Sequence, residues 1–248
     1  MNDKFWRITE VIIRAIYPAY LLLRYTDRSV PTMDKLYYYV RHVDASIEAQ
    51  VEDLNRLDDL YQEIAVERQT VDNYVEYSTD DDSDYGSDDD SVDEIIQNDS
   101  LGLGDRILKQ WNKRKKKLIH DYSLTGWILS PLPDVLNSVI NTSQQKARKA
   151  MRRVFKQLFF TNAEEDDQEH MQALDMLYKE LRQFQSKTGP FDDKFIWNST
   201  RLVSGNSHLW HFDYSYHETE WLVKLACRIC SKITGMGSAE CCWGDTKH

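Results

Sequence analysis

The sequence has 248 residues, of which 41% are hydrophobic and 12% aromatic, enough for a buried core in one large domain or two ordinary ones. This composition excludes a chain that is disordered throughout. The formal net charge is -10, but residues 72–99 hold twelve Asp or Glu and no Lys or Arg, so the rest of the chain carries +2. All four cysteines lie between Cys227 and Cys242, which excludes a disulfide framework and favours a reducing compartment.

The first stretch of the chain predicts a helix. Apolar side chains recur at helical spacing from Phe5 to Ile16. Pro18 ends or kinks this helix, and the apolar pattern resumes after it. The apolar stretch 11–23 is short and is interrupted by Arg14, so it fits neither a membrane span nor a signal peptide. We therefore expect no membrane role.

A second, longer helix is predicted after a turn at residues 27–32, with Thr32 as a candidate N-cap. Its apolar face comprises Met33, Leu36, Tyr37, Val40, Val43, Ile47, Val51 and Leu54. Residues 57–71 either extend this helix or turn back on it. Residues 1–71 are thus predicted to be a helical segment, the start of a helical bundle.

An acidic segment, residues 72–104, interrupts the helical pattern. Its run of Asp and Ser has too little apolar surface to offset the entropy of ordering, and its like charges repel. We predict a mobile, disordered acidic linker. The acids do not have the alternating spacing of a calcium loop, so we predict no metal site there.

Residues 105–204 are predicted to be a helical segment with basic faces. We assign candidate nucleic-acid contacts to Lys113, Arg114, Lys115, Lys116, Lys117, Arg152 and Arg153, because clustered cations match phosphate groups. The alternatives are a solvated helix face, or a face that neutralises the acidic linker. Residues 127–133 are predicted to be a buried apolar turn between the two basic stretches. A further helix is predicted over 168–186, ended by Gly189 and Pro190.

The tail, residues 205–248, combines aromatic residues with an amphipathic helix from about Glu218 to about Thr234. Gly235 and Gly237 are expected to stop this helix, and Glu240 follows them. We interpret the apolar stripe of the tail as a protein interface formed by Trp210, Trp221, Leu222, Leu225, Ala226, Ile229 and Ile233.

The order of these residues resembles the C-terminal dimerisation region of hAT-superfamily transposases. That family has a tryptophan, then a pattern L-x-x-L-A, then S-A-x-E-R-x-F-S. Here Trp210 is followed by Trp221-Leu222, Leu225-Ala226 and Ser238-Ala239-Glu240, while Cys241 and Trp243-Gly244 depart from the family pattern. The resemblance implies the end of a ribonuclease-H-like transposase domain and makes Glu240 the vestigial third acid of a catalytic set.

The resemblance also bears on activity. Transposases of this kind use three carboxylates to hold two divalent metal ions such as Mg²⁺. The first two acids of that set would lie upstream of Met1, so we expect a portion of a longer transposase and no enzyme activity or cofactor for this chain. A zinc site built from Cys227 and Cys230 with other cysteines or histidines is the weaker alternative, and we predict no metal site.

These observations together predict a mainly α protein, a helical bundle interrupted by an acidic disordered loop. The function expected from them is a dimerisation module derived from a hAT transposase, located in the nucleus. Its partner would be a second copy or another transposase-derived protein, with DNA as a further partner. The alternatives are a nucleic-acid-binding remnant and a fragment of an active DNA transposase.

Overall fold

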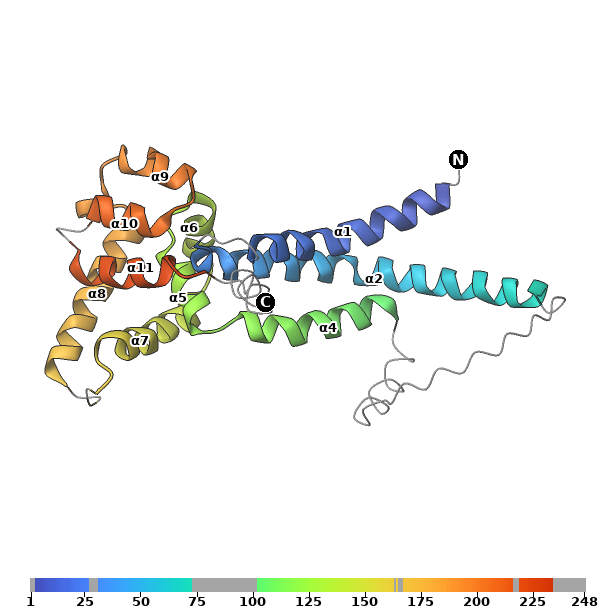
Figure 1. Cartoon of the computed structure of the whole chain (residues 1–248), viewed down its shortest axis with the longest axis horizontal. Helices are drawn as coiled ribbons and strands as arrows, with labels where there is room; N and C mark the ends of the chain where they lie inside the picture. The colour runs from blue at the N-terminus through green and yellow to red at the C-terminus, as the bar shows by residue number, and fades with distance from the viewer. Residues whose placement is uncertain are drawn as a thin grey trace, which may run out of the picture. The chain divides into compact units, whose positions relative to one another are not determined.

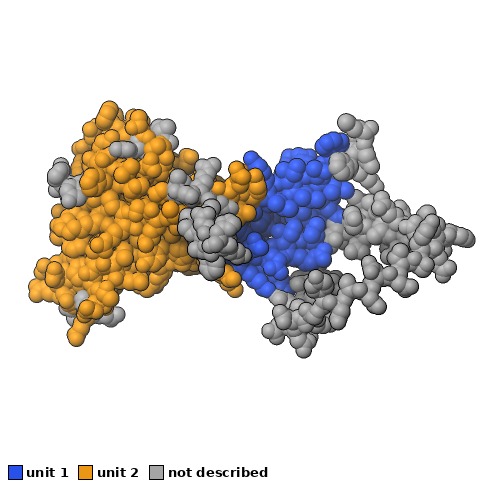
Figure 2. Space-filling model, viewed as in Figure 1, with its two compact units in different colours: residues 1–19, 43–114 blue, residues 20–42, 115–248 orange. Residues whose placement is uncertain are grey.

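The computed structural model describes residues 3–26, 31–72, 102–162, 164, 167–215 and 219–233. The chain is mainly helical, as predicted, and no strand occurs in these residues. The chain divides into two compact units, residues 1–19 with 43–114 and residues 20–42 with 115–248, which Figure 2 colours separately. We refer to them as unit 1 and unit 2.

Two long helices open the chain (Figure 1). Helix α1 spans Asp3–Thr26 without a break, so Pro18 does not end it. Helix α2 spans Met33–Asp72, and residues 57–71 therefore extend it rather than turning back. The predicted apolar face of α2 is confirmed at six positions, which are buried: Met33, Leu36, Val40, Val43, Ile47 and Leu54.

Unit 1 consists of α1 up to Ala19, α2 from Val43, and most of α4, Leu103–Leu118. Helix α4 begins inside the predicted acidic linker, most of which lies outside the described residues. The side chain of Asn55 on α2 accepts the backbone N–H of Gly104 at 2.8 Å and donates to Asp105 at 2.9 Å. The Trp111 indole of α4 donates to Asp44 at 3.0 Å. These bonds hold the start and the middle of α4 against α2.

The remaining helices belong to unit 2 and are shorter (Figure 1). They are α5 (Asp121–Leu129), α6 (Pro133–Ile140), α7 (Gln145–Phe159), α8 (Gln168–Ser186), α9 (Thr200–Val203), α10 (Ser207–Ser215) and α11 (Glu220–Cys230), with single 3-10 turns at Gly189–Phe191 and Ile196–Asn198. Helix α8 confirms the helix predicted over 168–186. The apolar turn predicted at residues 127–133 is wrong in its first half, because Trp127 and Leu129 form the buried end of α5.

A buried carboxylate joins three parts of unit 2. The side chain of Asp34 on α2 accepts hydrogen bonds from Ser130, which follows α5, at 3.1 Å and from Ser207 on α10. Lys35 donates to the carbonyl of Gly205 at 2.8 Å. Burial raises the pKa of Asp34, while Lys35 and the two serines lower it. Polar contacts inside the core thus connect α2 to two segments that lie more than ninety residues further along the chain.

No helix in the described part of the chain has the length and hydropathy needed to cross a bilayer.

Candidate functional site

The stripe on α11 is covered by the chain itself. Leu222, Leu225, Ala226 and Ile229 have no exposed surface, and neither has Trp210 on α10. Helix α11 packs against α5, α8 and α10, so this side of it forms the centre of unit 2. The prediction that these five residues form an interface with another chain is wrong for this structure. An apolar stripe of this width suits a core as well as an interface, and the sequence does not say which.

Trp221 and Ile233 differ from the rest of the stripe. Ile233 follows α11 and is exposed. Trp221 is half-buried, and its ring contacts Phe159 and Phe160 at the end of α7, with centroids 5.8 and 5.7 Å away. These rings line an apolar groove with a cavity of about 490 Å³. Among the predicted interface residues, these two are the ones whose side chains remain accessible.

Glu240, the predicted vestigial acid, lies outside the described residues. Among the residues that are described, no three His, Cys, Asp or Glu side chains gather where they would hold a metal ion. Burial raises the pKa of the Cys227 thiol to about 11 and that of Cys230 as well, with Asp34 and Cys227 adding to the effect at Cys230. Both side chains are therefore protonated thiols at neutral pH, and a thiol is a weaker nucleophile than a thiolate.

The first basic stretch ends α4. Lys113 and Arg114 are exposed in unit 1, and in unit 2 Lys116 and Lys117 are exposed while Lys115 is partly buried. Cations in the last turn of a helix interact favourably with its partial negative charge, so this placement stabilises α4 whatever else the lysines bind.

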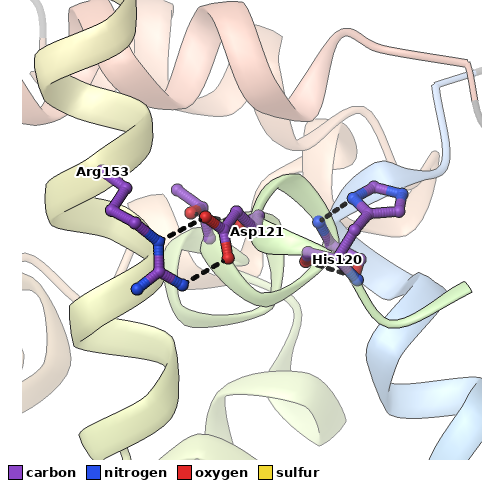
Figure 3. Close-up of polar contacts among 5 residues, drawn as sticks. His120, Asp121 and Arg153 are labelled. Carbon is purple, nitrogen blue, oxygen red and sulfur yellow. Dashed lines mark hydrogen bonds and ion pairs between the residues drawn. The ribbon is translucent and has the colours of Figure 1, made fainter. Parts of the chain in front are cut away.

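In the second basic stretch, on α7, Arg152 and Arg153 lie in different surroundings. Arg153 binds both carboxylate oxygens of Asp121, at 2.6 Å each, where α5 begins (Figure 3). This contact holds the pKa of Asp121 below its usual range. His120 caps α5, because its ring accepts the N–H of Ser123. Arg153 therefore joins α7 to α5 while its side chain remains 62% exposed, and Arg152 beside it is exposed as well, so their role as nucleic-acid contacts stays a prediction.

A groove between α7 and α8 brings Arg148, from the second basic stretch of the sequence, together with Lys179 and Arg182, which the sequence did not single out. Its lining comprises Arg148, Asp175, Met176, Tyr178, Lys179 and Arg182 around a cavity of about 680 Å³. Burial raises the pKa of Tyr178, while Arg152 and Arg148 lower it, so both guanidinium groups lie near its phenol. We call this site the basic groove. Its signal in the sequence is the spacing of four between Arg148 and Arg152, which places both on one side of α7.

Unit 1 exposes a row of large apolar side chains on α1. Between 37% and 55% of each remains accessible, and the row comprises Trp6, Ile12, Ile13, Ile16 and Tyr17. We call this row the α1 face. The opposite side of the helix is covered by the chain, since Ala15 is buried and Ser46 of α2 donates to the carbonyl of Arg14 at 3.1 Å. The sequence showed one apolar face on this helix, whereas the structure shows apolar residues on both sides.

Comparison of the chain with models of known families, with curated proteins and with solved structures found no match.

Proposed function

We propose that this chain is a protein-association module that forms a homodimer through the α1 face. The observation that carries the proposal is the exposure of five large apolar side chains on one side of a helix whose other side is already packed. Isolated apolar residues on a surface need no explanation, but a contiguous row of this kind marks a site of association. The proposal keeps the dimer expected from the sequence and moves it from α11 to α1.

Ile13→Glu tests the dimer, because it places a charge in the middle of the α1 face. Light scattering coupled to gel filtration is expected to give a dimer mass for the wild type and a monomer mass for the variant. Ile140→Glu is the matched control, since Ile140 on α6 has a similar exposed fraction, 52% against 55%. A wild-type chain that stays monomeric at high concentration would contradict the proposal, as would equal effects of the two substitutions.

Descent from a hAT transposase, a ribonuclease-H-like ancestry, a nuclear location and the lack of nuclease activity belong to the same proposal. Their support is the order of Trp210, Trp221, Leu225 and Glu240 in the sequence. Nicking of supercoiled plasmid with Mg²⁺ tests the activity. Cleavage by the purified chain that disappears in Glu240→Gln would refute the absence of catalysis.

Nucleic-acid binding is the second candidate, favoured by the basic groove. Arg148, Lys179 and Arg182 line it, and Arg152 lies beside Tyr178. Its lining includes one acidic residue, Asp175. Such a groove suits phosphate groups, which bind guanidinium and ammonium groups without regard to base sequence.

A duplex DNA titrated with the protein at several salt concentrations tests this second function. Affinity is expected to fall steeply as the salt concentration rises. Arg182→Gln is expected to weaken binding and to lower by about one the number of phosphate contacts derived from the salt dependence. Lys194→Gln, an exposed cation outside the groove, serves as the control. DNA binding that Arg148→Gln and Arg182→Gln leave unchanged would rule the groove out.

A further inference from the structure

Two opposite charges border the α1 face. Glu10 and Arg14 are one helical turn apart and form an exposed ion pair, with 2.5 Å between the guanidinium and the carboxylate. At 100° per residue both side chains lie on the same edge of the face, and Ile13 lies near its centre. The opposite edge holds Ile8, Ile12 and Ala19, which carry no charge. The face is therefore charged along one border only.

We propose that α1 pairs with α1 of a second copy in antiparallel orientation, about a two-fold axis at Ile12 and Ile13. This inference rests on the proposed dimer and specifies its geometry. In a two-fold interface each contact occurs twice, with the two partners exchanged. An axis midway between Glu10 and Arg14 therefore places Glu10 beside the partner's Arg14, and Arg14 beside the partner's Glu10.

Because only one border of the α1 face is charged, antiparallel and parallel pairing place the charges differently. When two helices pack in parallel, the charged border of one lies against the opposite, uncharged border of the other. When they pack antiparallel, the two charged borders lie together. Only the antiparallel arrangement converts two exposed intrahelical ion pairs into a four-charge network across the interface, and complementary charges of this kind fix orientation and register.

The size of the α1 face agrees with a second copy as its occupant. With the axis at Ile12 and Ile13, residues 6–18 overlap for about 18 Å, at a rise of 1.5 Å per residue. Since a whole aromatic side chain presents about 150–250 Å², the five side chains together expose on the order of 500 Å² per chain. Two copies would bury about 1,000 Å², the area above which specific interfaces are found.

Charge reversal tests the geometry. Glu10→Arg places four like charges in the network, and sedimentation at low salt is expected to show about tenfold weaker dimerisation. Reversing both charges, Glu10→Arg with Arg14→Glu, restores the pairs with exchanged signs and is expected to recover wild-type affinity within about threefold. Glu52→Arg is the matched control, because it breaks an exposed pair with Arg56 at the same spacing on α2.

A cysteine scan gives a second readout. Ile13→Cys lies at the axis and is expected to form a disulfide with its own copy under mild oxidation, identified by the mass of the linked peptides. Trp6→Cys lies about 18 Å from its own copy in the antiparallel pair, given the helical rise, and is expected not to link. Efficient linking at both positions would indicate parallel pairing and overturn the inference.

The outcomes separate this inference from the dimer itself. If Ile13→Glu dissociates the dimer while Glu10→Arg leaves it unchanged, the proposed function stands and the antiparallel geometry fails. If the wild type is a monomer, both fail. Loss of affinity in Glu10→Arg that the double reversal does not recover also refutes the two-fold charge network.

Discussion

The carboxylate of Glu180, in the middle of α8, accepts the backbone N–H of Leu222 at the start of α11, at 2.7 Å. The N–H groups of Trp221 and Glu220 also favour its ionised form. The residue before α11, Thr219, gives no side-chain cap to the helix. Glu180 therefore caps α11 from another helix, and this bond brings the predicted interface stripe into the core of unit 2.

Glu180→Ala is expected to lower the free energy of unfolding by about 1–3 kcal/mol, because it leaves buried N–H groups of α11 without an acceptor. Glu180→Gln keeps an acceptor oxygen. Burial raises the pKa of Glu180, so the charged form is disfavoured in the fold and a neutral amide avoids that cost. Urea denaturation is expected to place the Gln variant within about 1 kcal/mol of wild type.

Asp175→Asn, an exposed carboxylate on the same helix, is the control for this pair of variants. Equal stability of Glu180→Ala and wild type would show that the cap contributes nothing.

The stability of unit 2 should depend on pH through His211. Its Nε2 lies 2.7 Å from the carbonyl oxygen of Leu129, and burial lowers its pKa from 6.5 to about 4. Between these values the unfolded chain binds a proton that the folded chain does not, so stability falls as the pH falls from about 6.5 to about 4. By linkage the loss is about 3 kcal/mol.

The comparison of wild type with His211→Gln isolates this contribution, because the buried acids Asp34 and Glu180 are present in both. The variant is expected to show a shallower slope of unfolding free energy against pH in that window. His42→Gln, on an exposed part of α2, is expected to retain the wild-type slope. Parallel curves for all three proteins would exclude His211 as the source.

Leu225→Ala distinguishes a core position from an interface position on α11. Leu225 is fully buried in one chain, so the substitution is expected to cost about 2–5 kcal/mol of unfolding free energy through lost contacts and a cavity. Ile233→Ala, from the same predicted stripe but exposed, is expected to cost less than about 1 kcal/mol. Guanidinium denaturation at several protein concentrations measures both. If Leu225→Ala acted only by dissociating a dimer, its effect would vanish at high concentration.

Periodicity alone placed helices α1, α2, α8 and α11. Helix α8 matched its prediction because Asp167 caps its start and Lys187, in a left-handed conformation, ends it two residues before Gly189. Helix α5 was missed, since its apolar residues form no stripe and its cap is His120, a residue type that seldom signals a helix start.

Periodicity does not say what covers an apolar side chain. The stripe on α11 and the α1 face look the same in the sequence, because both consist of large apolar residues at spacings of three and four. The first is buried because α5, α8 and α10 pack against it, and the second is exposed. That difference depends on contacts between residues far apart in the chain, such as Glu180 with Leu222, which no local pattern encodes.

Gly104→Ala tests the close approach of α4 to α2 in unit 1. A Cβ at Gly104 would lie 2.3 Å from the carbonyl oxygen of Val51 and 2.9 Å from Oδ1 of Asn55. The carbonyl belongs to the α2 backbone and cannot turn away, so the helices must separate and weaken the Trp111–Asp44 bond. This overpacking is expected to cost about 1–3 kcal/mol, although alanine has the higher helix propensity.

Gln110→Ala, exposed on α4, is the control and is expected to be neutral or slightly stabilising. Hydrogen exchange of the α4 amides measures the effect locally, and unchanged protection in Gly104→Ala would contradict this packing of α4 on α2.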